Sequence, residues 1–523
     1  MNPTILFWIA TLLYFAAMVY IGIWIYQRVK GDTGTHQLLD FWIATRRYKG
    51  WWLACSLASG WLMLGWLGYG ISMVYMMGLS GLWCLPLPWL ILCFIIIWMV
   101  PHVRKFGALS LPEAIQKRYG GKTRTIMALC SIFVFTSWTG AETYMAGQLA
   151  SPFLHTPPWA AMIVVIIPIM IYTYLGGFRA SIITDLFQFI LCGLFITVLA
   201  VVGLHSANTA AGGHLISQLS SIATPNYGPG TMFGLFACGF AMPIILLLAY
   251  IPGWMIEQDL LLRIQGAKSL SEAKKGAWWG LVLIGIFVIL MPVLIAFSAI
   301  ILFPPGAASS AVAIGKDATG IISAIILHYF PLWAQVLMLV GILAAQMSTI
   351  DTFANIIALP LIYDFVQPFF FKKMSRESVA LWTRILSVAA VGLGLIYGLN
   401  ATSLMDIYTL SSGVLTASIA IPAIAMFIRG TNRTGVIWSA ILGFAGNVIF
   451  YILEYKVWQH NFAPKWFADT SLGYIMVGLA ASIIGLVIGS WIGKPATAEQ
   501  LASIAPKPLE GVDVFDLAKE PQG

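Results

Sequence analysis

Long apolar segments alternate with short polar ones from the first residues of the chain to Trp491. Each apolar segment is about 20 residues long, the length that an α-helix needs to cross the hydrocarbon core of a bilayer. The strands of a membrane β-barrel would instead alternate every second residue, and this chain lacks that pattern. The predicted helices occupy residues 4–27, 48–76, 82–100, 123–150, 158–175, 181–204, 231–251, 276–303, 332–360, 380–398, 403–428, 434–454 and 472–493. We therefore predict an all-α polytopic membrane protein with about 13 transmembrane helices.

The composition agrees with this prediction. Hydrophobic residues make up 60% of the chain, charged residues 9%, and the mean hydropathy is +0.88, whereas a soluble domain carries about 25% charged residues. The first apolar segment is too long for a signal peptide and lacks a basic start, so we expect it to remain as a helix. We expect a membrane domain at 1–493 and a loosely ordered cytoplasmic tail at 494–523, where alanine, proline and charged residues are frequent.

Most of the 28 lysines and arginines fall in alternate loops, such as those at 28–49 and 104–124. The opposite loops hold only Lys316, Lys456 and Lys465. Because basic loops stay in the cytoplasm, we predict an outside N-terminus and a cytoplasmic C-terminus in a cell membrane. Contact with anionic lipids then explains the net charge of +8 without a nucleic-acid partner.

Two predicted helices contain residues that interrupt a helix. The segment 56–61 reads SLASGW, and Pro252 and Gly253 precede Trp254 and Glu257. Each of these helices is the first of about five consecutive ones, and a repeat with an odd number of helices must be inverted in its second copy. We therefore expect a five-plus-five inverted repeat, LeuT-like, whose broken first helices frame a binding site near the middle of the membrane.

The predicted helix 332–360 places hydroxyls and a carboxylate within two turns, at Ser348, Thr349, Asp351 and Thr352. Sodium binds such hard oxygen ligands, but serine and threonine also bond to carbonyls of their own helix, and both interpretations stay open. A carboxylate inside a membrane is harder to explain without a function.

The segment 176–188, which reads GGFRASIITDLFQ, resembles a signature of the sodium:solute symporter family, as do residues 258–263, 267–269 and 272–273. The resemblance implies a sodium site and, in some members, a second one. The first would comprise the carbonyls of Ser59, Leu62 and Ala345 with the hydroxyls of Ser348 and Thr349; another register would replace Ser59 and Leu62 by Cys55 and Ala58. The second would comprise Asp185, Asp351 and Thr352.

Within that family the chain is most similar to the choline transporter branch, through residues 59–61, 410–412, 430–432 and 513–516. That branch implies an aromatic cage around a quaternary ammonium group. The corresponding positions here are Trp61, Trp138 and Tyr408. A further cage tyrosine of that branch falls at Leu90, beside Trp89, and a cage tryptophan falls at Trp254 or Glu257.

Physical chemistry supports such a cage, because tryptophan faces attract a desolvated cation by about 2 kcal/mol. Glu142 lies one helical turn beyond Trp138 on the same face, and either Glu142 or Glu257 would complement a cation. The two carboxylates would alternatively pair with each other or with a lysine, or handle protons. Most of the 21 tryptophans must serve as interfacial or packing residues.

The leading hypothesis is a symporter that couples inward sodium movement to the import of a small organic cation such as choline. An amino-acid or monocarboxylate symporter is the alternative, although its substrate would favour an arginine in the cavity, and Arg179 and Arg263 are expected at cytoplasmic helix ends. The six cysteines lack the spacing of a metal site or disulfide framework, so we expect them to pack as small apolar residues. The chain contains no nucleophile elbow, metalloprotease or phosphate-binding motif, so an enzyme or a membrane sensor is disfavoured.

Overall fold

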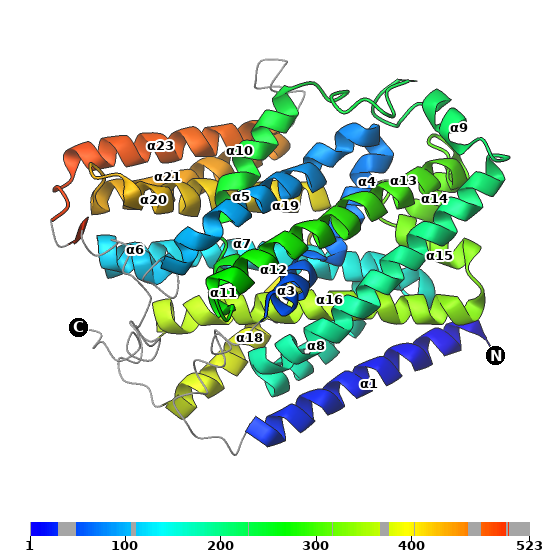
Figure 1. The fold of residues 1–523 in the computed structure, drawn as a ribbon, viewed down its shortest axis with the longest axis horizontal. Helices are drawn as coiled ribbons and strands as arrows, with labels where there is room; N and C mark the ends of the chain where they lie inside the picture. Colours follow the sequence, from blue (N-terminus) through cyan, green and yellow to red (C-terminus); the bar gives the residue numbers. More distant parts are fainter. Residues whose placement is uncertain are drawn as a thin grey trace.

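The computed structural model describes residues 2–29, 49–105, 111–228, 230–315, 317–366, 376–401, 403–458, 472–497 and 500–501. Within these ranges the regular elements are helices (Figure 1). Eleven described stretches are long and apolar enough to cross a membrane. The all-helical membrane fold is therefore confirmed. Eleven is fewer than the predicted thirteen because α4 and α5 fall in one stretch, Leu64–Val103, and because the apolar helix Ala241–Met255 is shorter than a full span.

The helices vary widely in length. The longer ones are α1 (Pro3–Val29), α5 (Pro86–Lys105), α7 (Gly121–Leu154), α8 (Pro158–Ala210), α16 (Leu332–Pro360), α18 (Arg376–Leu399), α21 (Arg433–Ile452) and α23 (Gly473–Ile492). Those of intermediate length are α3 (Gly50–Trp61), α4 (Leu64–Met77), α10 (Ala241–Met255), α12 (Leu270–Ile284), α13 (Met291–Leu302) and α19 (Leu404–Leu415). The short ones are α6 (Leu111–Tyr119), α9 (Leu215–Ser221), α11 (Gln258–Gly266), α14 (Ala308–Ile314), α15 (Ile321–Tyr329) and α20 (Ile421–Ile424).

Short segments of other helical types adjoin some of these helices. A 3₁₀ turn, η2 (Gly78–Cys84), joins α4 to α5, and another, η6 (Ala425–Phe427), follows α20. The π-helical segments are η3 (Gly285–Leu290), η4 (Leu361–Val366), η5 (Thr416–Ala420) and η7 (Leu453–Val457). Because η3 continues α12 into α13, these three elements form one apolar span, Leu270–Leu302.

Helix α16 lies at the centre of the bundle. In the most apolar part of α16, 83% of the residues are buried, and the same holds for Leu404–Phe427, which contains α19. The corresponding share is 28% for α1 and for α23, which lie at opposite edges of the molecule in Figure 1. The polar residues of the predicted helix 332–360 therefore lie in the interior of the helix bundle.

The structure corrects two predicted helix boundaries. The seventh predicted helix, 231–251, is wrong at its start, because 231–240 form turns and α10 begins at Ala241. Gly239 has φ +75°, a left-handed conformation that a regular helix does not contain. The predicted helices 158–175 and 181–204 lie in one run of helical backbone, α8, which still contains two separate apolar spans, Pro158–Leu175 and Gln188–Ala210.

The predicted break in the second helix is confirmed, but it lies after Trp61 rather than at Gly60. Leu62 (φ −84°, ψ 50°) and Met63 (φ −71°, ψ 135°) leave the helical region between α3 and α4. Gly60 itself remains helical. A Cβ atom at this position would lie 2.5 Å from Nη2 of Arg263, which explains the glycine. The glycine thus makes room for a guanidinium group.

The second predicted break is also confirmed and lies between α10 and α11, where Glu257 (φ −56°, ψ 129°) is extended. Pro252 stays inside α10. The hydroxyl of Thr416 accepts from the Gly253 N–H (3.0 Å) and donates to the Ala249 carbonyl. It stands between the two groups that a regular α-helix would join, which is a recognised cause of a local helix distortion.

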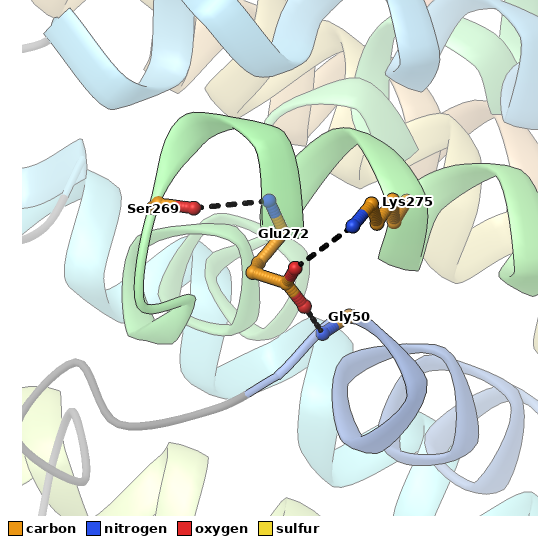
Figure 2. Close-up of polar contacts among 4 residues, drawn as sticks. All are labelled: Gly50, Ser269, Glu272 and Lys275. Atoms are coloured by element: carbon orange, nitrogen blue, oxygen red, sulfur yellow. Dashed lines mark hydrogen bonds and ion pairs between the residues drawn. The ribbon is translucent and has the colours of Figure 1, made fainter.

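The half-helix α3 is held at its N-terminus by the first turn of α12 (Figure 2). The Glu272 carboxylate accepts from the Gly50 N–H and lies 3.2 Å from Nζ of Lys275, while Oγ of Ser269 accepts from the Glu272 N–H (3.2 Å). A Cβ atom on Gly50 would lie 2.9 Å from the Glu272 carbonyl oxygen. A carboxylate thus meets the positive end of α3, where it is favourable.

We predict that Glu272→Gln lowers the thermal unfolding midpoint of the purified protein, because a neutral amide interacts more weakly with the end of α3. Gly50→Ala should lower the midpoint further, since the added methyl must displace backbone. Lys268→Gln, an exposed change in the same loop, serves as the matched control. Equal midpoints for Glu272→Gln and Lys268→Gln would show that this contact does not hold α3.

Candidate functional site

Six large aromatic side chains meet beside the two helix breaks, and we call them the ring cluster. They come from α3, α4, α5, α7, α10 and α19, and none is more than 5% exposed. The members are Trp61, Trp66, Trp89, Trp138, Trp254 and Tyr408. The structure therefore brings together all the aromatic positions that the sequence suggested for the cage, and it adds Trp66.

Trp66 is the centre of the ring cluster. Its ring centroid lies 4.5 Å from that of Tyr408, 5.2 Å from Trp254, 5.7 Å from Trp89 and 5.8 Å from Trp138. The sequence did not single out Trp66, because in an unbroken helix it would point about 140° away from Trp61. The break at Leu62 and Met63 removes that constraint, and the rings of Trp61 and Trp66 both contact Trp89.

The rings of α5 and α10 stack on one another. The Trp89 and Trp254 centroids are 4.8 Å apart with 27° between planes, and Tyr250 stacks on Trp254 at 4.4 Å and 7°. On α5, Trp89 is buried in the ring cluster while Leu90 is only half-buried. On α10, Trp254 enters the ring cluster and Glu257 is the buried N-cap residue of α11.

The indole N–H groups of the ring cluster differ in their partners. Trp138 donates to Oγ of Ser411 at 2.8 Å. Nε1 of Trp61, Trp66 and Trp254 is buried and has no hydrogen-bond partner among the described residues. Buried donors in native proteins are usually paired, so these three groups are the polar positions at which the ring cluster is able to receive an oxygen atom.

The Glu142 carboxylate occupies the N-terminus of α4. Both of its oxygens accept from the Gly65 N–H, at 3.1 Å and 2.9 Å, and the amides of Leu64 and Trp66 also face it. Tyr408 donates its hydroxyl to Oε1 at 3.2 Å. A Cβ atom on Gly65 would lie 2.4 Å from that hydroxyl and 2.6 Å from Oε1, so this contact requires glycine at position 65.

A fourth contact links Glu142 to α16. The Gln346 side-chain amide, oriented with its nitrogen toward acceptors, donates to the Glu142 carbonyl (2.9 Å) and to Oε2 (3.2 Å). Gln346 follows Ala345, a predicted sodium ligand. The carboxylate is therefore shared by α4, α16 and α19. It is fully buried, and the hydrogen bonds from these neutral donors offset part of the cost of burying a carboxylate.

The predicted sodium ligands on α16 converge on one carbonyl. Oγ of Ser348 (2.9 Å) and Oγ1 of Thr349 (3.2 Å) both donate to the Ala345 carbonyl. Helix α16 also contacts α3, the half-helix that ends next to Leu62. The back-bonding interpretation therefore describes these hydroxyls here, and their role as sodium ligands stays a prediction. The side chain of Ser59 lies outside the described part of the chain.

The predicted second sodium site is described only in part. Asp351 is 1% exposed, Asn355 donates to its carbonyl (2.9 Å), and Thr352 donates to the Ser348 carbonyl (2.9 Å). The Asp185 side chain is not among those described. Asp351 and Thr352 are thus buried on the central helix, while the ion site itself stays a prediction.

Arg263 reaches further than expected. Its guanidinium donates to the carbonyl and, at 2.8 Å, to the hydroxyl of Ser56 on α3, and it lies against Gly60. Arg263 lies in the last turn of α11, at a helix end as expected, but the sequence did not predict the contact of its side chain with α3. Because α11 is short, Arg263 lies close to the break, and its side chain is long enough to reach the Ser56 carbonyl on α3.

Comparisons with known proteins agree with this architecture. The sodium:solute symporter family profile matches residues 41–443. Sodium/glucose cotransporter 4 of Mus musculus is 22% identical over 95% of this chain and 77% of its own length. Sodium/proline symporter 2 of Staphylococcus saprophyticus is 25% identical over 86% of each chain.

Among solved structures, a substrate-bound Na⁺-coupled sialic acid symporter in an outward-open state has a TM-score of 0.72 at 17% identity, covering 94% of this chain and 99% of its own. Mhp1, a nucleobase-cation-symport-1 family transporter, has a TM-score of 0.54 at 11% identity, covering 88% and 97%. Likeness at these identities shows a shared LeuT-like fold. The family match covers most of the chain, and we conclude that this protein belongs to the sodium:solute symporter family.

Proposed function

We propose that this sodium-coupled symporter imports a small organic cation, such as choline, and holds it in the ring cluster. The observation that carries the proposal is the Glu142 carboxylate, buried beside these rings and bonded to neutral donors. The single buried basic side chain in the described residues is Arg118, which bonds to the Thr431 carbonyl. The carboxylate that contacts the ring cluster, Glu142, would complement a positive solute.

The rings supply the second part of the argument. A cation over the face of a tryptophan gains about 2 kcal/mol when both are desolvated, and a quaternary ammonium group cannot neutralise itself by losing a proton. Trp66 contacts both Trp254 and Tyr408, so several aromatic rings lie close together in the ring cluster. Three indole N–H groups are available to bond the oxygen of an alcohol such as that of choline.

The named relatives carry glucose or proline, and this chain departs from what those solutes would need. A sugar needs many hydrogen-bonding side chains, whereas the ring cluster offers mainly apolar faces. The carboxylate of an amino acid would favour the positive end of a broken helix. At α4 that position is filled by Glu142.

Sodium coupling follows from the family, and we propose that Ser348, Thr349 and the Ala345 carbonyl bind the ion. Gln346 supports this placement, because it links the same turn of α16 to Glu142 and hence to the ring cluster. Asp351 and Thr352, with Asp185, are proposed for a second ion. We further propose that the N-terminus is outside and the C-terminus cytoplasmic, following the basic loops.

In proteoliposomes, an inward sodium gradient should drive uptake of labelled choline, and other quaternary amines should compete. The purified protein in vesicles contains every component that the proposal needs. If a sugar or a carboxylate is taken up while choline is not, the organic-cation assignment is wrong.

We predict that Trp66→Leu raises the choline concentration at half-maximal uptake about 30-fold, the equivalent of losing about 2 kcal/mol of cation attraction. Trp66→Phe, which keeps a ring, should have a smaller effect. Trp98→Leu is the control, because Trp98 is 67% exposed on the outer surface of the bundle. Equal uptake by Trp66→Leu and Trp98→Leu would remove Trp66 from the binding site.

We predict that Ser348→Ala raises the sodium concentration needed for half-maximal uptake about 10-fold or more, because one oxygen ligand is lost. The matched control is Ser298→Ala, whose buried hydroxyl also bonds to its own helix but lies on α13. Unchanged sodium dependence in Ser348→Ala would leave this hydroxyl with a packing role only.

A further inference from the structure

We infer that Glu142 determines substrate specificity by excluding solutes that carry a carboxylate, because its own carboxylate fills the N-terminus of α4. This inference rests on the proposal that the solute binds at the ring cluster, and it adds which charged groups that solute must lack. Glu142 thereby blocks the N-terminus of α4, in addition to contributing a charge.

The N-terminus of α4 has the physical properties of an anion site. A helix begins with backbone N–H groups that lack partners and with a partial positive charge of about half an elementary unit. Where a helix is broken inside a membrane, that end is available to a substrate anion, as in transporters with discontinuous helices. Here Gly65 donates to both Glu142 oxygens, and Leu64 and Trp66 also face them.

Three elements keep Glu142 in this position. Its own helix is α7, Tyr408 holds Oε1 from α19, and Gln346 holds Oε2 from α16. The Gly65 site leaves no room for another group, since even a Cβ atom would approach Oε1 to 2.6 Å. A substrate carboxylate would therefore have to displace a side chain that accepts hydrogen bonds from three donors, Gly65, Tyr408 and Gln346.

Electrostatics acts in the same direction. When both are ionised, two carboxylates at about 4 Å in a protein interior repel strongly enough to change binding by about 100-fold or more. The ring cluster lies next to this charge, because Tyr408 contacts both Glu142 and the Trp66 ring. A cation gains from the same carboxylate that an anion must avoid.

Choline and glycine betaine provide the matched pair of probes. Both carry a trimethylammonium group, and they differ in an alcohol against a carboxylate. Binding of each to the purified full-length protein in sodium would be measured by equilibrium binding of the labelled compound. The wild-type protein should prefer choline by about 100-fold or more. Glu142→Gln should reduce that preference to about 10-fold or less, because the neutral amide no longer repels a carboxylate.

Tyr408→Phe is the matched control, because it removes one hydrogen bond to Glu142 and keeps the negative charge. Its preference for choline over betaine should stay close to that of the wild type, even if both compounds bind more weakly. A role for Glu142 that is only structural would lower both affinities together in Glu142→Gln. If Glu142→Gln does not fold, Glu142→Met offers the same loss of charge. The preference of the wild type for choline over betaine remains a required result in either case.

The outcomes separate this inference from the proposed function. If the wild type binds choline and Glu142→Gln still rejects betaine, the inference is overturned and the proposed function stands. Equal binding of betaine and choline by the wild type would also overturn the inference alone. If the wild type binds neither, the choline proposal fails. Acetate then tests the inference by itself: against matched chloride, it should raise the thermal midpoint of Glu142→Ala, whose short side chain leaves the N-terminus of α4 open, but not that of the wild type, and equal shifts would overturn it.

Discussion

A broken helix inside a membrane exposes backbone groups that lipid cannot satisfy, and the rest of this structure depends on how they are satisfied. At the break, the N–H groups that begin α4 donate to the Glu142 carboxylate, and within the adjoining α3 the Arg263 guanidinium donates to the Ser56 carbonyl. At α10 the Thr416 hydroxyl stands between Gly253 and Ala249. Each break is therefore stabilised by a polar side chain from another helix.

These same contacts join the proposed solute and ion sites. Glu142 is bonded to Tyr408 in the ring cluster and to Gln346, which neighbours Ala345 on α16. A change in the position of α16 on sodium binding would therefore alter the carboxylate and the rings that it touches. Coupling between two ligands is reciprocal by thermodynamic necessity, so the solute must affect sodium affinity by the same factor.

Much of this arrangement was predictable from the sequence. Apolar segment lengths predicted the helices, and α16 matches the predicted range 332–360. The aromatic positions Trp61, Trp138 and Tyr408 were predicted by resemblance, and all three are members of the ring cluster. These features depend on length and residue type, which a sequence contains directly.

Other parts depend on three-dimensional contacts that no local pattern contains. Trp66 faces the ring cluster only because Leu62 and Met63 interrupt the helix, so helical spacing pointed away from it. Gln346 bonds to Glu142 across more than 200 residues of sequence. Arg263 was expected at a helix end, and its reach to Ser56 follows from the packing of α11 against α3.

Sodium and an organic cation are proposed to bind to two coupled sites at the helix breaks. Calorimetric titration of choline into the purified protein, in sodium and in an inert monovalent cation, tests this coupling most directly. We predict that sodium strengthens choline binding and that choline strengthens sodium binding by the same factor. Choline binding of equal strength with and without sodium would show that the two sites are not coupled.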